Sequence, residues 1–287
     1  MANKYYYNKD YFKEINTADK AYWLGFLYAD GYVCRQFKNG KVKSMNLELT
    51  VCEKDVSQLI KFKNCLESNI EIHEKNVKLN NEIYKERRIN VCSTEMCRDL
   101  IKLGCTPQKT YDIKFPTFDI VPKEYMRDFL RGFFDGDGCI STTLMNGKPH
   151  ITLSISGMST MLKSIVDFLF TEKIITTRPT FAKDKRREFT YNIYFHGTDG
   201  CKYLLDYLYK DAKTYLDRKY NKYIEFYKDY KEINKRGVYW SNRNNAYIVT
   251  ICNNGERERI GQYKNLEDAI NARREAERIK TLNSQLS

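Results

Sequence analysis

A nine-residue pattern that occurs twice constrains this chain more than any other feature of its 287 residues. "WLGFLYADG" spans residues 23–31 and "LRGFFDGDG" spans residues 130–138, and each ends in an acid followed by glycine. The two acids, Asp30 and Asp137, are 137 − 30 = 107 residues apart. The Asn-Gly pairs that follow, at 39–40 and 146–147, share this offset, 146 − 39 = 107. Two landmarks at one offset indicate an internal duplication.

The expected elements follow the same order in both copies. A helix ends at the motif acid, and Asn-Gly between strand-like runs predicts a tight hairpin, because both residues adopt positive φ easily. Alternating strands, a helix with apolar residues at helical spacing, a second hairpin and a last helix follow. We place the basic tips of the second hairpins at 84–88 and 183–188. The sequence therefore predicts an α+β fold, a pseudo-two-fold pair of αββαββα units.

A different pattern begins after residue 235. Residues 237–280 are typical of three short strands, the last two joined at Asn254-Gly255, and an amphipathic helix. The segment 114–125 carries two of the five prolines and is expected to link the halves. The expected domains are residues 1–118, 119–233 and a small module at 236–282. The helix residues expected to face inward are Ala269, Ile270, Ala272, Ala276 and Ile279.

The net charge indicates a polyanionic partner. Lysines and arginines outnumber acids by 49 − 37 = 12, which favours nucleic acid as the partner. An acidic membrane surface is the competing interpretation. No run approaches the roughly 18 apolar residues of a membrane span, and the first ten residues are too polar for a signal peptide. We expect an intracellular protein, in a bacterial or phage-infected cytoplasm or in an organelle.

Cysteine and histidine usage narrows the chemistry. The nine cysteines include no C-x-x-C pair, so neither a zinc ribbon nor a secreted disulfide framework is indicated. Only three histidines occur and none neighbours another, which disfavours histidine-based metal or triad chemistry. Any catalysis is expected to use carboxylates, lysines and a metal held by oxygen.

The motif itself predicts where the acids meet. The pairs Gly25 and Ala29, and Gly132 and Gly136, are four apart, so each lies on one helical face and lets two helices approach closely. If these helices pack together, Asp30 and Asp137 converge. A carboxylate at a helix C-terminus is opposed by the helix dipole, and two together repel. The arrangement suggests Mg²⁺, or another divalent cation such as Mn²⁺, able to activate water against a phosphodiester.

The motif also has structural explanations. One helix ending in Asp-Gly is usually a plain C-cap, but two copies with matched hairpins favour a shared site. An EF-hand is excluded, because Cys139 stands where an oxygen ligand is needed and Asn146 stands at the twelfth loop position.

The two motifs resemble the paired motifs of LAGLIDADG homing endonucleases, and the similarity extends over residues 5–230. The resemblance implies a single-chain pseudo-dimer with a saddle-shaped antiparallel DNA-binding sheet and the motif helices at the interface. It implies that Asp30 and Asp137 bind divalent metal and catalyse staggered double-strand cuts in long DNA sites. Tyr28 departs from the pattern where Asp135 stands in the second motif, at a position that is commonly not a ligand.

The same resemblance places a basic residue near each active centre. "LGCTPQKTYDIKFP" suggests Lys109 in the first half, and "YLDRKYNKY" suggests Lys219 in the second. Either residue could instead make a surface ion pair. On the first hairpin and the basic tips, the candidate DNA contacts are Arg35, Lys85, Arg87, Arg88, Lys183, Lys185, Arg186 and Arg187.

The C-terminal module resembles the AP2-type DNA-binding domain, a three-stranded sheet backed by a helix. The similarity rests on "RGVYW", "AYI", Asn254-Gly255, Ile260-Gly261 and "EDAINARREAE", with Tyr247 standing where tryptophan is usual. In that family the sheet contacts the major groove. The resemblance therefore implies DNA contacts from Trp240, Arg243, Arg257 and Arg259.

The sequence thus predicts a monomeric, site-specific, Mg²⁺-dependent double-strand DNA endonuclease with an added DNA-binding module. One alternative is an RNA maturase that assists splicing of its host intron on the same scaffold. A second is a DNA-binding regulator without cleavage, although such a protein would have no reason to keep two mutually repelling acids.

Overall fold

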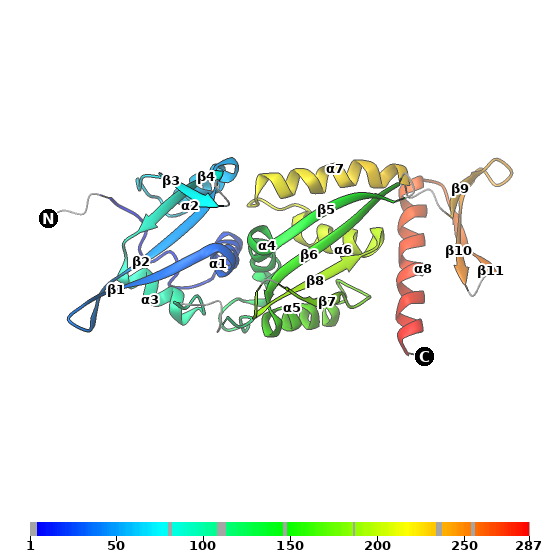
Figure 1. Cartoon of the computed structure of the whole chain (residues 1–287). Helices are drawn as coiled ribbons and strands as arrows, with labels where there is room; N and C mark the ends of the chain where they lie inside the picture. Colours follow the sequence, from blue (N-terminus) through cyan, green and yellow to red (C-terminus); the bar gives the residue numbers. More distant parts are fainter. Residues whose placement is uncertain are drawn as a thin grey trace.

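The computed structural model describes residues 5–79, 82–107, 113–145, 148–185, 187–233, 237–253 and 256–286. Its elements form two similar halves followed by a third unit (Figure 1). Within the described part of the chain, no helix is both long and apolar enough to span a membrane.

In the described residues up to 107, the first half is an antiparallel four-stranded sheet with three α-helices. Its strands lie in the order β1-β2-β4-β3. The elements are α1 (Ala18–Asp30), β1 (Gly31–Lys38), β2 (Lys41–Cys52), α2 (Val56–Cys65), β3 (His73–Leu79), β4 (Glu82–Val91) and α3 (Thr94–Lys102).

The second half repeats this arrangement, with strand order β5-β6-β8-β7. The predicted order αββαββα is confirmed in both halves, and a further helix, α7 (Asp217–Ile233), follows. The elements are α4 (Met126–Asp137), β5 (Gly138–Met145), β6 (Lys148–Met158), α5 (Ser159–Thr171), β7 (Thr180–Lys183), β8 (Thr190–His196) and α6 (Thr198–Tyr209).

Local sequence explains several element boundaries. The Thr17 side chain accepts a hydrogen bond from the backbone N–H of Lys20 and caps the start of α1. Asn39 and Gly40 have φ of 51° and 74°, as a tight β1–β2 hairpin requires. The corresponding pair at 146–147 lies outside the described residues. Each motif helix passes directly into a strand at its glycine, whose N–H donates to a carbonyl of the last turn.

One predicted hairpin tip is wrong. Residues 84–88 lie inside β4, where Arg87 pairs with Val51 and Arg88 pairs with Thr50 across the ladder with β2. The basic run forms a strand because acids on neighbouring elements neutralise it: Arg87 contacts Glu53 at 2.6 Å. The other predicted tip is confirmed, since β7 ends at Lys183 and β8 begins at Thr190.

The third unit is a three-stranded sheet with one helix, as expected. β9 (Val238–Ser241), β10 (Ala246–Asn253) and β11 (Glu256–Tyr263) lie in the order β11-β10-β9, followed by α8 (Leu266–Leu286). Ala269 is fully buried against this sheet. Ile279 was expected inward and is 50% exposed, because it lies beyond the part of α8 that packs on the sheet. Figure 1 shows α8 between the second half and β9–β11.

Candidate active site

The two motif helices, α1 and α4, pack side by side through their small residues. A Cβ added at Gly25 would collide with the carbonyl oxygen of Phe129, and one added at Gly132 would collide with that of Tyr22. The two contacts are reciprocal, because each residue in one contact has its equivalent, 107 positions away, in the other: 132 − 25 = 107 and 129 − 22 = 107. A pseudo-two-fold axis between the helices requires such a relation. At Gly136 an added Cβ would overlap the side chain of Ala29. Only residues with little or no side chain allow this approach.

This packing brings the two motif acids to one place. Asp30 ends α1 and Asp137 ends α4. The Oδ2 atom of Asp30 lies 3.3 Å from the Cβ position at Gly136, the residue directly before Asp137. Asp30 is exposed and Asp137 is partly exposed, so solvent and a ligand can reach both carboxylates.

A small cavity opens beside Asp137. Its volume is about 170 Å³, and its lining includes Tyr28 and Asp137 from the motifs and Arg187 from the turn between β7 and β8. A carboxylate and a guanidinium therefore face the same space, where the Arg187 side chain could hold an anionic oxygen. The sequence predicts for Arg187 only a general DNA contact, and the structure adds its position in this cavity.

Lys219 lies behind the acids and not among them. Its side chain is 1% exposed, and its Nζ donates to the carbonyl oxygens of Phe134 at 2.5 Å and Asp135 at 2.7 Å. Burial lowers the pKa of Lys219 to about 8, while the charges of Asp135, Asp30 and Asp137 oppose that shift. The amine can thus act on the acid pair through charge and through the end of α4. The other predicted lysine, Lys109, lies outside the described residues.

Asp135 points away from the acid pair into the core. It accepts hydrogen bonds from the hydroxyls of Tyr22 at 2.7 Å and Tyr209 at 2.6 Å, and from the Leu216 N–H at 2.7 Å. Burial raises its pKa, against the charge of Lys219 and these hydrogen bonds. The matching residue of the first motif, Tyr28, donates instead to the carbonyl of Leu103.

The crossover segment, residues 211–219, leads from α6 into the first turn of α7 and contacts the first half. Of these residues the sequence predicts only Lys219 for the site, and not the contacts with the first half. Asp217 accepts from Lys61 at 2.5 Å and from Ser57 at 2.8 Å. Arg218 pairs with Asp55 at 2.8 Å. An available signal was the repeated "KTY" at 109–111 and 213–215.

Known proteins share this arrangement of helices and sheets. Residues 124–178, which contain α4, match the family model described as the LAGLIDADG-like domain. The structure of the meganuclease I-SmaMI bound to uncleaveable DNA with a TTGT central four aligns with a TM-score of 0.52 and 15% identity, covering 75% of this chain and 90% of that one. The chain has the LAGLIDADG meganuclease fold.

Further solved structures share the LAGLIDADG fold with this chain. The meganuclease I-AabMI bound to uncleaved DNA aligns with a TM-score of 0.50 and 10% identity, over 75% of this chain and 91% of that one. I-SmaMI bound to cleaved DNA aligns with a TM-score of 0.50 and 16% identity, over 75% and 90%. No curated protein matches the sequence significantly.

Each sheet of this LAGLIDADG fold has one face on helices and an opposite face, here termed the free face. Alternation along the strands assigns the side chains, because Leu47, Ile89, Leu153 and Ile193 are buried in the core. The accessible residues on the free face of the first sheet include Tyr32, Glu48, Thr50 and Arg88, whereas Asn46 on the same face is buried. That of the second includes Ser141, Thr152, Ser154, Asn192, Tyr194 and His196.

The predicted DNA contacts divide between these faces. Arg35, Lys85 and Arg87 share the phase of the buried strand residues and so lie on the helix side, as does Lys183, which pairs with Tyr191. Arg88 lies on the free face. Lys185 and Arg187 are exposed in the β7–β8 turn, and Arg186 lies outside the described residues.

In the C-terminal sheet, the predicted DNA contacts also lie on different faces. A bulge between Val249 and Thr250 puts Arg257 and Arg259 on the face opposite α8, with Arg259 paired to Thr250. Trp240 shares the helix side with Val238 and meets Tyr247 edge-on at 4.9 Å. Arg243 is exposed in the β9–β10 turn.

Proposed function

We propose that this protein is a site-specific DNA endonuclease that cuts both strands of a long target in a divalent-metal-dependent reaction. The proposal rests on one observation, the reciprocal packing of α1 and α4 that puts Asp30 beside the residue preceding Asp137. Two negative groups held together at solvent, with a buried lysine behind them, suit a site for a cation and a phosphodiester.

The donor set fits Mg²⁺ or Mn²⁺. Among the described residues there is no cluster of three or more His, Cys, Asp or Glu able to hold a metal. Asp30 and Asp137 would supply two carboxylates, and water and phosphate oxygens would complete the shell, as Mg²⁺ prefers. When bound, such an ion polarises the phosphodiester and makes water a stronger nucleophile. Lys219 would offset the repulsion between the acids, and Arg187 would hold a phosphate oxygen.

Charge and shape support double-stranded DNA as the partner. The chain carries a net charge of +12. The free faces carry hydroxyl, amide and ring side chains that can contact base edges and phosphates, and an antiparallel strand pair fits the major groove. The solved structures of I-SmaMI and I-AabMI that share the fold are described as bound to DNA.

We further propose a domain organisation, a role for the C-terminal module and a cellular setting. Residues 1–118 and 119–233 would form the two halves of a monomeric enzyme, and 236–282 an AP2-like module that binds DNA through Arg257 and Arg259. The setting would be an intracellular mobile genetic element that homes to its own target. An RNA maturase remains the alternative, and it would bind intron RNA whether or not Asp30 and Asp137 are intact.

The direct test is a cleavage selection. Purified protein is incubated with a plasmid library of randomised inserts in Mg²⁺, and the ends of linear products are sequenced. We expect one family of sites with staggered ends, and no linear product in excess EDTA. Undiminished cutting in EDTA would refute the metal requirement. Absence of cutting together with tight binding to structured RNA would favour the maturase.

A further inference from the structure

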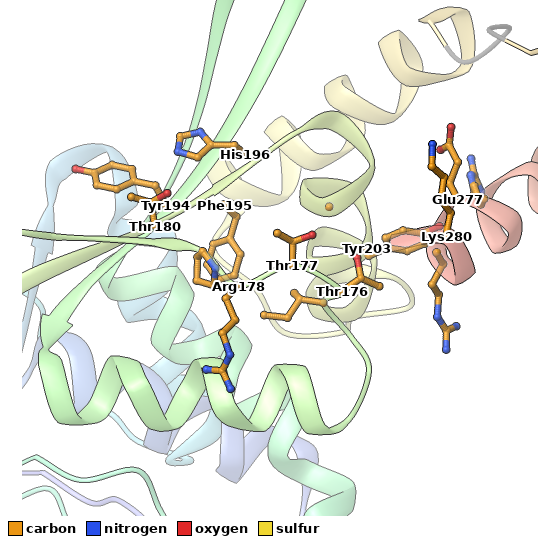
Figure 2. Close-up of a pocket in the computed structure, with 15 residues that line it drawn as sticks. Thr176, Thr177, Arg178, Thr180, Tyr194, Phe195, His196, Tyr203, Glu277 and Lys280 are labelled. Atoms are coloured by element: carbon orange, nitrogen blue, oxygen red, sulfur yellow. The ribbon is translucent and has the colours of Figure 1, made fainter. Parts of the chain in front are cut away.

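A cleft of about 510 Å³ lies at the outer end of the second sheet, between that half and α8. Its residues are drawn in Figure 2. One wall comes from the loop between α5 and β7, from β7 and β8, and from α6, and the other comes from the middle of α8. This volume is within the roughly 300–1,000 Å³ range of ligand sites.

The α8 wall is cationic. Arg274 and Arg278 lie four residues apart, hence on one face of the helix, and Lys280 lines the same cleft. Two acids lie on this stretch of the helix: Glu277 pairs with Arg273, and Glu275 pairs with Arg278 at 3.5 Å. The Lys280 amine also donates to the carbonyl of Cys252. Four basic residues, at 273, 274, 278 and 280, against two acids leave an excess of positive charge. Among the described residues, the Nε of Arg278 is shielded from solvent and has no hydrogen-bond acceptor. An anionic oxygen would supply one.

The opposite wall is the end of the free face of the second sheet. His196 ends β8 and Thr180 begins β7, and the rings of Tyr194 and His196 lie nearly parallel, 6.2 Å apart. Arg178 does not contribute its charge here, because it pairs with Asp167 at 2.7 Å on the α5 side. This wall therefore carries hydroxyls and rings. Figure 2 shows the Tyr194 ring directed away from α8, whereas Tyr203, which also lines the cleft, lies on the side toward α8.

β8 connects the cleft to the candidate active site. Thr190, at one end of the strand, lines the cavity beside Asp137, and His196, at the other end, lines the cleft. Six steps at about 3.3 Å make the separation about 20 Å. Figure 1 shows the second sheet extending from α4 toward α8. At about 3.4 Å per base pair, DNA on this sheet would reach α8 about six base pairs from the cut.

We propose that this cleft grips the sugar-phosphate backbone of the DNA duplex where it leaves the second sheet, so that α8 contacts DNA as well as supporting the C-terminal sheet. This inference rests on the proposed function. Arg274, Arg278 and Lys280 bind phosphates, while His196 and Tyr194 lie against the adjacent sugar or base edge. The contact is sequence-independent and extends the protected target beyond the free face.

The test is a salt titration of binding to a random-sequence 60-base-pair duplex. The cleft variant is R274A/R278A, and the control is K102A/K163A, which removes equal charge from exposed positions on α3 and α5. The slope of log affinity against log salt is negative, and each lost phosphate contact reduces its magnitude by about 0.9. We expect a decrease of about 2 for the cleft variant beyond that of the control, and recovery in R274K/R278K. Equal slopes for cleft variant and control would overturn the inference.

Footprinting on the selected target separates this inference from the proposed function. We expect R274A/R278A to lose backbone protection about six base pairs from the cut on the second-half side only. If wild-type protein cuts its target and this protection is unchanged, the inference alone fails. If wild-type protein neither binds nor cuts DNA, both fail. Loss of binding to structured RNA without loss of DNA binding would also overturn the inference.

Discussion

The amine of Lys219 lies 2.7 Å from the carbonyl oxygen of Asp135, at the end of the helix whose last residue is Asp137. The last carbonyls of a helix have no partner within it, and they carry the negative end of its dipole. Lys219 donates to two of the last carbonyls of α4, those of Phe134, which also accepts from the Gly138 N–H, and Asp135. It adds positive charge behind two carboxylates. A cation on the buried side thus makes a repulsive pair on the exposed side tolerable.

Replacing Lys219 by Met should lower the free energy of unfolding by about 1–3 kcal/mol, because the carbonyls of Phe134 and Asp135 each lose a hydrogen bond from a buried amine. Urea denaturation at pH 7.5 measures this. The control is Lys222→Met, which removes one hydrogen bond to Ile140 on the neighbouring strand. A smaller loss for Lys219→Met than for Lys222→Met would contradict this assignment.

The stability difference between wild type and Lys219→Met should depend on pH. Burial lowers the pKa of Lys219 to about 8 in the folded state, whereas it is 10.5 in the unfolded chain. Between these values the unfolded state binds more protons, so the contribution of Lys219 to the free energy of unfolding rises with pH. In denaturation experiments from pH 7.5 to 10, the free energy of unfolding of the wild type should increase relative to that of Lys219→Met. Parallel curves would show that the folded pKa is not lowered.

Asp30→Asn and Asp137→Asn should each reduce double-strand cleavage at least about 100-fold, the scale of losing one charge-stabilising group, while DNA binding persists. Gel assays on the selected target measure both. The control is Asp211→Asn, an exposed acid with a φ of 60° that asparagine tolerates. Cutting by both variants at the wild-type rate would remove these residues from the site.

Gly25→Ala and Gly132→Ala should destabilise the protein by about 1–3 kcal/mol or more, because the added methyl meets backbone of the facing helix. Thermal unfolding measures the change. Gly200→Ala is the matched control, since a Cβ there meets nothing within 4 Å and the residue lies in α6. The control should be neutral or stabilising by up to about 1 kcal/mol. Equal effects at all three positions would argue against close helix packing.

Ending the chain after Ile233 should leave a folded enzyme with weaker DNA binding. The apolar contacts of β9–β11 with α8 form a cluster separate from the main core, so their removal exposes little of it. Circular dichroism, cleavage and salt-dependent affinity measure the outcome. Arg257→Ala/Arg259→Ala in the full chain should reproduce part of the affinity loss. Unfolding of the truncated protein would refute a separable module.

The sequence alone determined the duplicated element order, the Asn39-Gly40 hairpin and the helix pair meeting at small residues. These follow from local causes: periodicity, positive φ, and the absence of a Cβ that would obstruct a neighbour. The placement of Asp30 next to Gly136 follows from the same pattern, because the spacing of small residues specifies which helical faces meet.

Only the tertiary structure decided what the charged residues do. Arg87 and Arg88 are adjacent in sequence and lie on opposite faces of β4, one beside Glu53 and the other near Glu48. Lys219 is buried, and Asp135 accepts hydrogen bonds from Leu216 and Tyr22, which lie 81 and 113 positions away in the sequence. These roles depend on which distant segments of the chain pack together. That packing, and not the adjacent residues in the sequence, sets the burial and the partners of a charged side chain.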